Sequence, residues 1–350
     1  MNSWFSRTLL NWNRLENHRQ MPWKGEKDPY RIWLSEIILQ QTRVEQGRAY
    51  YERFISSFST VSQLASAPQQ EVFKLWEGLG YYSRCRNMTK AAQAIVEQFN
   101  GRFPDSYKDV LSLPGVGPYT AAAICSFAYN QPFAVVDGNV YRILARIFEI
   151  TIPVDSDAGK KHFNTLATDL LDKENSAEYN QAIMDFGATV CKPKNPLCNQ
   201  CPFHDRCNAY KHNTVYSYPV KTKKLLRRTR YFYYFFLEKD DEIMVRERVT
   251  KDIWQHLYEP VLVEAEKELS EKEINPLLRK IGIPADSVSG LRYSVKHSQQ
   301  LTHQQICGIF THVSLKNKVD ALSGYQWVNK SEFEKLPFPR YILSYLKEKK

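Results

Sequence analysis

The sequence predicts two domains of different structural class, an all-α domain over residues 1–207 and an α+β domain over residues 231–350. Three observations lead to this prediction. Apolar residues recur at helical spacing through most of the first part, where almost nothing alternates with the period of a strand. A glycine- and proline-rich loop over residues 114–117 interrupts these helices. Beyond residue 230, runs of aromatic and β-branched residues are typical of strands.

Length and charge narrow the class of protein. A chain of 350 residues is long enough for two hydrophobic cores. The net charge of +10 and the pI near 9.1 favour a polyanionic partner, a property shared by nucleic-acid-binding, ribosomal and membrane-surface proteins. No window approaches about 18 uninterrupted apolar residues, and the first residues lack a signal-peptide core. We therefore expect a soluble, cytoplasmic protein.

The first helices contain a candidate catalytic acid. Residues 1–28 read as one helix followed by a loop, and Asp28-Pro29 is a favourable start for a helix expected over residues 30–46. Within that helix, apolar residues surround Glu36 at helical spacing. This carboxylate is either a surface residue beside the apolar stripe or a buried acid whose pKa is raised by burial.

Further helices are expected over residues 50–58, 68–78 and 85–99, with a glycine-containing segment between the last two. That segment reads GLGYYSR over residues 78–84 and places two aromatic residues beside a cation. Aromatic side chains on such a turn are suited to wedging between bases or stacking on them, and the alternative is ordinary core packing.

The Gly-Pro loop predicts a helix–hairpin–helix. Gly115 and Gly117 permit backbone conformations closed to other residues, and Pro118 occupies a first helical position, where its missing N–H costs nothing. Bare N–H groups at the start of the following helix form a ready phosphate site. Asp137 then precedes another helix from an N-cap-like position, with backbone donors that favour its ionised form. The alternative is a loop between core helices followed by an ordinary N-cap.

A cysteine cluster follows the last two helices of this domain, which are expected over residues 158–171 and 176–190. Four of the seven cysteines have the spacing C-x6-C-x2-C-x5-C. Four thiolates can hold either a 4Fe-4S cluster or a structural zinc. Zinc ribbons usually pair two C-x2-C motifs, and only one is present, so the spacing favours the cluster. The four residues are Cys191, Cys198, Cys201 and Cys207.

The region after the cysteines differs in character. Residues 208–230 contain seven cations and no acidic residue, which predicts a basic interdomain linker whose charges are solvated. Strands are then expected over residues 231–237, 242–249, 292–296 and 304–315. Residues 231–350 are therefore expected to form a second, α+β domain.

Five motifs of the helical domain, taken together, resemble those of the MutY-type adenine DNA glycosylases, within the helix-hairpin-helix, iron-sulfur DNA glycosylase superfamily. They occur in the family's order and cover residues 1–208. The motifs are WLSEIILQQTRV (33–44), GLGYYSR (78–84), LPGVGPYT (113–120), VDGNVYR (136–142) and the four cysteines. The resemblance implies a six-helix subdomain and an iron–sulfur subdomain, with the catalytic cleft between them.

The resemblance also implies hydrolysis of an N-glycosidic bond, which needs a protonated leaving base and a stabilised sugar cation. Glu36 is similar to the family's general acid, which protonates the flipped adenine and then activates water. Asp137 matches the carboxylate that stabilises the cation or attacks it to form a transient covalent intermediate. Asn139 and Tyr119 match residues that orient these carboxylates and the sugar.

Tyr119 distinguishes two subclasses of the superfamily. Endonuclease III-like relatives cleave the DNA backbone through a Schiff base and carry a lysine two residues after the second hairpin glycine. In this chain that position is Tyr119. Because a tyrosine cannot form an imine, the resemblance implies a monofunctional glycosylase.

Further binding roles are implied by matching motif positions. The family's cluster places a DNA-binding loop, here at Pro193-Lys194, and takes no redox part in bond cleavage. The other residues assigned in this way are Gln41 and Tyr81 around the base opposite the adenine, Trp23 and Gln181 in the adenine pocket, and Gly115, Val116 and Gly117 in the hairpin at the DNA backbone.

The C-terminal domain resembles the family's Nudix-like domain, which recognises 8-oxoguanine opposite the adenine. No intact Nudix signature (G-x5-E-x7-R-E-x2-E-E-x-G) occurs in residues 231–350, because the acidic stretch 259–273 lacks its glycine and paired glutamates. This favours recognition over pyrophosphate hydrolysis. Where the family has a lesion-contacting Phe-Ser-His turn, this chain has Leu301-Thr302-His303, so a hydroxyl and an imidazole are present and the aromatic ring is not.

The sequence thus predicts an enzyme of base excision repair that removes adenine paired with 8-oxoguanine or guanine from double-stranded DNA. We expect it to act as a monomer, with a 4Fe-4S cluster and no membrane partner. Two alternatives stay open. One is a bifunctional pyrimidine-lesion glycosylase/lyase, which Tyr119 and the extra domain oppose. The other is a non-enzymatic DNA-binding iron–sulfur protein, in which Glu36 and Asp137 are structural.

Overall fold

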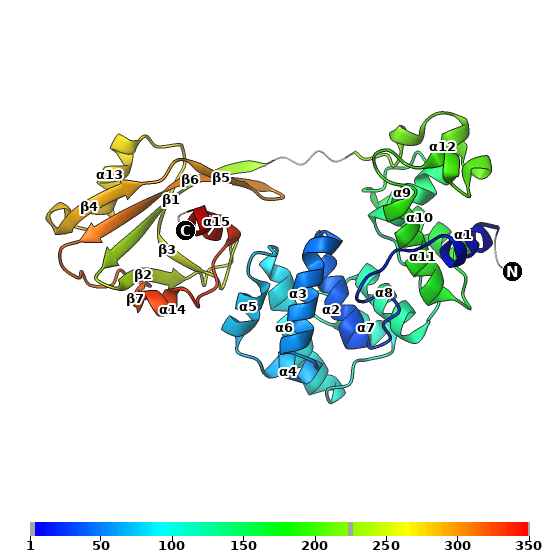
Figure 1. The fold of residues 1–350 in the computed structure, drawn as a ribbon, viewed down its shortest axis with the longest axis horizontal. Coiled ribbons are helices and arrows are strands. Elements are labelled where there is room, and N and C mark those ends of the chain that lie inside the picture. The colour runs from blue at the N-terminus through cyan, green and yellow to red at the C-terminus, as the bar shows by residue number, and fades with distance from the viewer. Residues whose placement is uncertain (1–3, 223–226, 349–350) are drawn as a thin grey trace. The chain divides into compact units, whose positions relative to one another are not determined.

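The computed structural model describes residues 4–222 and 227–348. They form two compact units, one of residues 4–66 and 86–222 and the other of Ala67–Cys85 and residues 227–348. The described residues before Arg228 form helices and no strand, whereas those beyond it form a sheet with helices (Figure 1). The predicted all-α part followed by an α+β part is confirmed. Within the described ranges, no helix is long and apolar enough to cross a membrane.

The helical region agrees with the sequence in most of its longer elements. The helices expected over residues 85–99, 158–171 and 176–190 correspond to α6, α10 and α11, whereas α4 was not expected. The helices are α1 (Trp4–Leu15), α2 (Pro29–Leu39), α3 (Val44–Ser57), α4 (Val61–Ser66), α5 (Gln69–Trp76), α6 (Tyr82–Phe99), α7 (Tyr107–Ser112), α8 (Pro118–Tyr129), α9 (Gly138–Ile147), α10 (Asp157–Leu170), α11 (Ser176–Thr189) and α12 (Asn208–Lys211), with short 3-10 helices η1 (Cys198–Gln200), η2 (His204–Arg206) and η3 (Val215–Ser217).

Two helix starts follow the capping rules on which the prediction rests. Asp28 caps α2 by accepting the N–H of Tyr30 at 2.9 Å, and Pro29 takes the first helical position. Gly117 is the N-cap of α8, and Pro118 follows it in the same way. Both starts were expected, and both place a helix that lines the candidate site.

The end of α2 differs from the prediction. The helix expected over residues 30–46 ends at Leu39, Gln41 has a left-handed φ of 56°, and α3 begins at Val44. The turn brings α3 back against α2, where a Cβ on Gly47 would lie only 2.7 Å from Cδ2 of Leu39. The periodic pattern continued across this turn because both helices contribute apolar residues to one interface.

The predicted helix–hairpin–helix is present as α7, the loop 113–117 and α8. Gly115 has a left-handed φ of 75°, and a Cβ there would lie 2.6 Å from Cβ of Asn87. Both observations explain why the loop requires glycine at this position.

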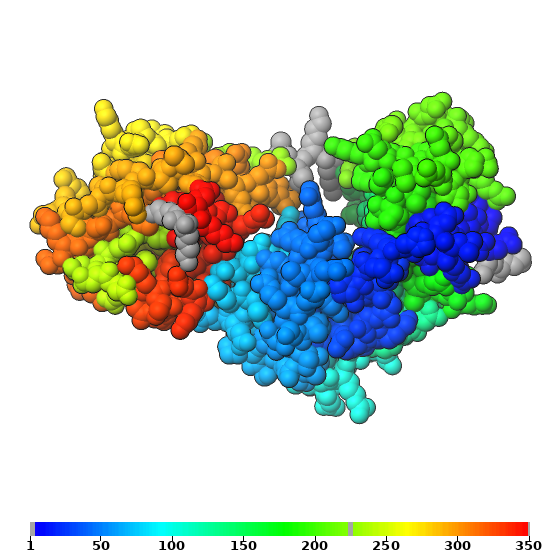
Figure 2. Space-filling model, viewed as in Figure 1, coloured from blue at the N-terminus to red at the C-terminus, as the bar shows by residue number. Residues whose placement is uncertain are grey.

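The first helix of the chain packs with the last helices of the helical region rather than with its neighbours in sequence. Phe5 of α1 stacks on Phe203 with ring centroids 4.9 Å apart, and Phe203 lies edge-on to Phe186 of α11 at 5.3 Å. Figure 2 shows dark-blue α1 against green residues of this later segment. The first helix and the last segments of the helical region therefore pack together in one hydrophobic core.

The segment after the last cysteine is partly folded, whereas the sequence predicted a linker over residues 208–230. It contains α12 and η3, Ala209 is fully buried, and the carbonyl of Val220 accepts the N–H of Val154 at 3.0 Å. β1 already begins at Arg228. Of the segment's described cations, Lys211, Lys221, Arg227 and Arg228 are exposed as expected, whereas Arg230 is only 12 % exposed and pairs with Asp252 and Glu264. The apolar residues of the segment pack on the helical unit. Residues 223–226 lie outside the described residues.

The second unit contains a seven-stranded sheet of order β4-β6-β1-β3-β2-β7, in which β5 also pairs with β6. β1 and β6 are parallel, and the other described pairs are antiparallel. Its elements are β1 (Arg228–Lys239), β2 (Glu242–Glu247), β3 (Tyr258–Ala265), α13 (Glu271–Lys280), η4 (Ala285–Ser287), β4 (Val288–Tyr293), β5 (His297–Gln300), β6 (Gln304–Leu315), β7 (Gln326–Asn329), α14 (Lys330–Phe333) and α15 (Arg340–Glu348).

Three of the four expected strands are confirmed as β1, β2 and β6. The strand expected over residues 292–296 is wrong, because it spans the break between β4 and β5. At this break the Ser294 hydroxyl accepts the N–H of Phe310 at 3.0 Å. A side chain thus takes the place of a backbone acceptor and ends the regular pairing.

Ala67–Cys85 belongs to the second unit, although the sequence placed it in the domain 1–207. The Lys74 ammonium on α5 donates to the carbonyls of Glu334 and Leu336, both at 3.0 Å. The N–H of Phe338 donates to Glu77 at 2.9 Å. Three hydrogen bonds therefore fix α5 and its C-cap residue Glu77 against the segment that follows α14.

Candidate active site

A cavity of about 700 Å³ lies within the helical unit, between α2, α8, α9, α11 and the loop before α2. The sequence separates its predicted lining residues by up to about 160 positions, and the fold brings them together. The expected residues that line it are Trp23, Glu36, Gln41, Tyr119, Asp137, Asn139 and Gln181.

Glu36 of α2 is buried in this cavity. It is therefore the buried acid, and not the surface residue, of the two alternatives that the sequence left open. The residue is 9 % exposed. Burial raises the pKa of its carboxyl from 4.5 to about 7; a hydrogen bond with the Tyr119 hydroxyl lowers it and the charge of Asp137 raises it further. The acid is therefore poised to hold and release a proton near neutral pH.

Asp137 is the N-cap of α9, as predicted. Its Oδ1 accepts the N–H groups of Asn139 and Val140, each at 2.8 Å, and its Oδ2 accepts the Asn139 side-chain amide at 2.6 Å. Burial raises the pKa of Asp137, and these donors together with the charge of Arg142 oppose the rise. The donors do not cancel the effect of burial, but they fix the carboxylate in one orientation.

Arg142 supports this arrangement and was not identified from the sequence. Its guanidinium donates to Oδ1 of Asn139 and to the carbonyls of Gly187 and Cys191, each at 2.8 Å. A Cβ on Gly187 would lie 2.5 Å from Cβ of Asn139, so only glycine admits this approach. Arg142 is three residues beyond Asn139 on a helix, and this spacing was the available signal.

Tyr119 contacts the acid and remains neutral. Burial, followed by the charges of Glu36 and Asp137, raises the pKa of its hydroxyl well above 10. The hydroxyl also lies 3.7 Å from Sδ of Met184. The side chain that stands at this position is therefore an uncharged hydroxyl beside the two carboxylates.

Trp23 and Gln181 both line the cavity. Trp23 is 9 % exposed and packs edge-on to Tyr51 with ring centroids 5.4 Å apart. Gln181 on α11 donates from Nε2 to Asp185 at 3.0 Å. An apolar ring and a polar amide thus share one pocket, an arrangement suited to a planar heteroaromatic base.

The hairpin presents backbone rather than side chains. Gly117 has nothing within 4 Å of an added Cβ, and Val116 is 8 % exposed. The first N–H groups of the twelve-residue helix α8 follow directly. This is the geometry expected of a phosphate site at a helix N-terminus.

The four predicted cysteines line one small apolar cavity together with Arg146. Burial raises the pKa of the Cys201 thiol to about 12, and the other three thiols act on it as near neighbours. Arg146 donates to Sγ of Cys191 at 3.5 Å and to the carbonyl of Lys192 at 2.8 Å. Four thiols and a cation around one space fit a cluster of net negative charge. It is the kind and number of these donors that fit the cluster, because no group of three or more His, Cys, Asp or Glu side chains in the described residues already has the arrangement of a metal site.

The expected lesion-contacting residues lie in the second unit. Thr302 occupies the turn between β5 and β6, and its hydroxyl lies 2.6 Å from that of Tyr81. The His303 carbonyl accepts the N–H of Arg228 at 3.1 Å, and its side chain is exposed. Tyr81 is 45 % exposed, so core packing is wrong for this residue, whereas its neighbour Tyr82 is 4 % exposed and does belong to the core. The structure brings Tyr81 and Thr302 together.

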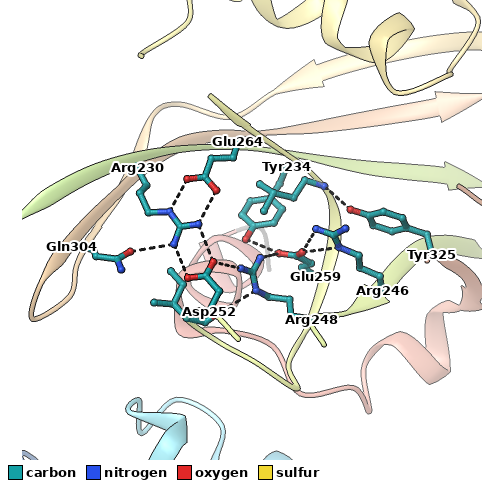
Figure 3. Close-up of polar contacts among 11 residues, drawn as sticks. Arg230, Tyr234, Arg246, Arg248, Asp252, Glu259, Glu264, Gln304 and Tyr325 are labelled. Carbon is teal, nitrogen blue, oxygen red and sulfur yellow. Dashed lines mark hydrogen bonds and ion pairs between the residues drawn. The ribbon is translucent and has the colours of Figure 1, made fainter. Parts of the chain in front are cut away.

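The acidic stretch of the second unit contains a carboxylate engaged in a buried polar network (Figure 3). Glu259 is fully buried and accepts from Arg246 at 2.9 Å, Arg248 at 2.5 Å and Tyr234 at 3.2 Å. Arg248 also donates to Asp252 at 2.9 Å. Both oxygens of Glu259 are therefore used in holding β2 and β3 to the core of the sheet.

Comparison with known proteins agrees with this architecture. Residues 34–164 match the HhH-GPD superfamily of base excision DNA repair proteins, and residues 233–348 match the NUDIX domain. The chain is 36 % identical to the adenine DNA glycosylase of Buchnera aphidicola subsp. Schizaphis graminum over 254 residues, which is 73 % of each chain. It is 42 % identical to the rat adenine DNA glycosylase over 215 residues, 59 % of this chain and 42 % of the relative.

Solved structures support the fold of the helical region. A thermostable thymine-DNA glycosylase is similar with a TM-score of 0.56 and 29 % identity, covering 59 % of this chain and 95 % of its own. A non-covalent endonuclease III–DNA complex is similar with a TM-score of 0.52 at 20 % identity, over 59 % of this chain and 94 % of its own, and shows the fold alone.

Proposed function

This chain belongs to the adenine DNA glycosylase family and is a DNA N-glycosylase, and on that premise we propose that it removes adenine opposite 8-oxoguanine or guanine in duplex DNA without cutting the backbone. The observation that carries the proposal is the pair of unlike carboxylates in one cavity. Glu36 has a pKa of about 7, whereas Asp137 is held by three hydrogen bonds.

Glu36 acts as the general acid. An N-glycosidic bond breaks when the departing base is protonated, and a carboxyl with a pKa near 7 holds a proton at neutral pH and still releases it readily. Once it has given up this proton, the carboxylate can accept one from an incoming water. The Tyr119 hydroxyl fixes the direction of the carboxyl group throughout.

Asp137 stabilises the positive charge that develops on the sugar. Its Oδ1 is saturated by two backbone N–H groups, and Asn139 holds Oδ2 in place. A carboxylate oriented in this way needs no rearrangement as the cation forms, which is the condition for effective electrostatic stabilisation. Attack of Oδ2 on the sugar carbon would give a covalent intermediate that water later hydrolyses.

Tyr119 supports the monofunctional mode. A backbone lyase needs an amine that forms an imine with the sugar aldehyde. The side chain beside both carboxylates is a neutral phenol, which supplies no such nitrogen. We therefore propose base release without strand scission.

Double-stranded DNA is the proposed partner, bound by a monomer of the enzyme. The net charge of +10 favours association with phosphates, and the hairpin offers N–H groups at the start of α8. In the second unit, Tyr81, Thr302 and His303 would contact the base opposite the adenine. The closeness of the first two hydroxyls supports one shared recognition site.

Cys191, Cys198, Cys201 and Cys207 would hold a 4Fe-4S cluster, which would supply structural cross-linking of this part of the chain rather than chemistry at the sugar. Arg146 connects this region to α9 by donating to the carbonyls of Lys192 and Pro193. By fixing the segment that contains the four cysteines, the cluster and Arg146 would hold the cations of that segment where they can contact DNA.

Single-turnover assays on duplexes with adenine opposite 8-oxoguanine, guanine or thymine test the proposal. We expect rapid adenine release from the first two duplexes, intact strands before alkali treatment, and no product trapped covalently by borohydride. Trapped protein–DNA product would favour the bifunctional alternative. Absence of base release with tight duplex binding would favour a non-enzymatic DNA-binding protein.

A further inference from the structure

The end of α5 carries an ion pair whose two members also bind the backbone of the segment that follows α14. The Lys74 ammonium lies 3.1 Å from Oε2 of Glu77, three residues further along the chain. Lys74 donates to the carbonyls of Glu334 and Leu336. Oε1 of Glu77 accepts the N–H of Phe338 at 2.9 Å. Because an exposed ion pair by itself contributes little to stability, the backbone contacts are what give this pair a role.

The backbone of Phe338 is held at both of its polar groups. Phe338 lies between two prolines, which have no N–H, so neither neighbour supplies a backbone donor and the N–H that Glu77 accepts is distinctive. The Phe338 carbonyl accepts the Tyr82 hydroxyl at 3.5 Å, and the Tyr82 oxygen accepts the N–H of Gly78 at 3.2 Å. Glu77 and Tyr82 flank the glycine turn (residues 78–81), so both ends of this turn contact one residue.

Phe338 is a fixed point of the sheet-containing unit. Its side chain is buried, and its ring packs on Phe333 with centroids 4.6 Å apart. The carbonyl of the preceding residue, Pro337, accepts the N–H of Tyr258 at the start of β3 at 2.9 Å. The contacts of Glu77 and Tyr82 with Phe338 therefore connect the glycine turn to the sheet.

The glycine turn holds Tyr81 in an unfavourable backbone conformation. Gly78, Gly80 and Tyr81 have left-handed φ values of 87°, 79° and 51°. Glycine adopts such values freely, whereas a tyrosine keeps them only where its surroundings hold it. The tip of the exposed Tyr81 side chain meets Thr302, with the two hydroxyl oxygens 2.6 Å apart. Tyr81 is thus fixed through the turn at its backbone and by Thr302 at its hydroxyl.

We infer that Glu77 is a positioning residue that, through the backbone of Phe338, sets the Tyr81 turn in register with Thr302, so that both side chains reach the base opposite the adenine together. The inference rests on the proposed function. Thr302 belongs to the sheet, whereas Tyr81 lies on a turn between two helices. A single contact at Thr302 would leave this turn free to pivot, and the second contact at Phe338 prevents that motion.

Glu77→Met tests this inference, because it removes the acceptor for the Phe338 N–H and keeps the length of the side chain. The measurement is the ratio of single-turnover adenine release rates opposite 8-oxoguanine and opposite guanine, at subsaturating enzyme. We expect the ratio to fall about tenfold, since one charge-assisted hydrogen bond is lost. Glu77→Gln keeps a carbonyl oxygen for Phe338 and should retain most of the ratio. Glu71→Met, at an exposed acid in the first turn of the same helix, is the matched control and should keep the wild-type ratio.

A double-mutant cycle separates positioning from a general loss of stability. If Glu77 acts through Tyr81, adding Glu77→Met to Tyr81→Ala lowers the ratio no further, because the residue that was positioned is already absent. A further tenfold loss in the double variant would overturn the inference. So would an unchanged ratio in Glu77→Met, or an equally low ratio in Glu77→Gln, because the Phe338 contact would then not be what places the turn.

A second variant keeps the test decisive should Glu77→Met fail to fold. Lys74→Met removes the two carbonyl contacts and the ion pair but leaves the Phe338 N–H its acceptor. It must lower the ratio, and do so only while Tyr81 is present; any other result overturns the inference. A wild-type protein that releases no adenine, or shows no preference for 8-oxoguanine over guanine, contradicts the proposed function instead, so the two failures are distinguishable.

Discussion

The hydroxyl oxygens of Tyr81 and Thr302 lie 2.6 Å apart, although 221 positions separate the two residues in the chain. The contact joins the glycine turn before α6 to the turn between β5 and β6. It is an exposed hydrogen bond, because Tyr81 is 45 % exposed. Two turns that the sequence assigned to separate domains therefore form one surface, and that surface is where we propose the base opposite the adenine is recognised.

The double variant Thr302→Ala/His303→Ala should lose most of its preference for adenine opposite 8-oxoguanine over adenine opposite guanine. A polar contact that distinguishes two bases is worth ~1–3 kcal/mol, or roughly tenfold to a hundredfold. Relative single-turnover rates at subsaturating enzyme measure the preference. Ser298→Ala, an exposed residue of neighbouring β5, is the control. Full preference in the folded double variant would place recognition elsewhere.

Glu36→Gln should lower the rate of base release by ~10²–10⁴-fold, because the amide keeps the shape of the side chain but has no proton to transfer. Binding of the lesion duplex should persist. Single-turnover kinetics and a binding titration separate these two effects. Glu45→Gln, an exposed acid in the first turn of α3, should behave as the wild type. Near-normal release by Glu36→Gln would exclude Glu36 as the acid.

The same substitution should change how stability depends on pH. The pKa of Glu36 is about 7 in the folded protein and near 4.5 otherwise, so the folded state binds the extra proton between these values. Stability from this group is complete below pH 4.5 and is lost as pH rises to 7, by about 3 kcal/mol. Glutamine does not titrate, so the Tm of Glu36→Gln relative to wild type should rise from pH 5 to pH 8. An unchanged difference would contradict the buried, shifted acid.

The predictable parts of this structure are those fixed by local rules. Asp28, Gly117 and Asp137 each begin a helix where capping chemistry places one. The sequence alone did not decide whether Glu36 is buried, because an apolar helical stripe does not indicate which of its edges is covered by other elements. Asp185 and Arg142 were missed because most of their partners come from distant segments, and helical spacing connects each of them to one side-chain partner only.

The amino-acid composition of a segment also gave wrong predictions of its structure where contacts with distant segments determine that structure. β3 was not expected because Glu259 and Glu264 interrupt its apolar residues, yet both carboxylates are paired with arginines on neighbouring strands. The segment 208–222 has the composition of a linker, but it buries Ala209 and Val215 against the helical unit. A count of charges does not reveal these few apolar contacts, because they depend on a surface formed elsewhere in the chain.

Removal of one cysteine should release the iron and weaken DNA binding without affecting the catalytic geometry directly. Four thiols around one cavity predict about four irons per chain in protein purified without oxygen, and no stoichiometric zinc. Cys198→Ser should lose most of this iron and bind duplex DNA more weakly, because the segment that Arg146 contacts through Lys192 and Pro193 is then no longer cross-linked.

Cys307→Ser is the matched control, because this buried thiol belongs to β6 in the other unit. It should retain full iron content and normal affinity, whereas a loss equal to that of Cys198→Ser would point to general instability. Iron analysis and a binding titration on the same preparations decide the matter. Stoichiometric zinc in the wild-type protein would instead identify a structural zinc site, the alternative that the single C-x2-C motif argues against.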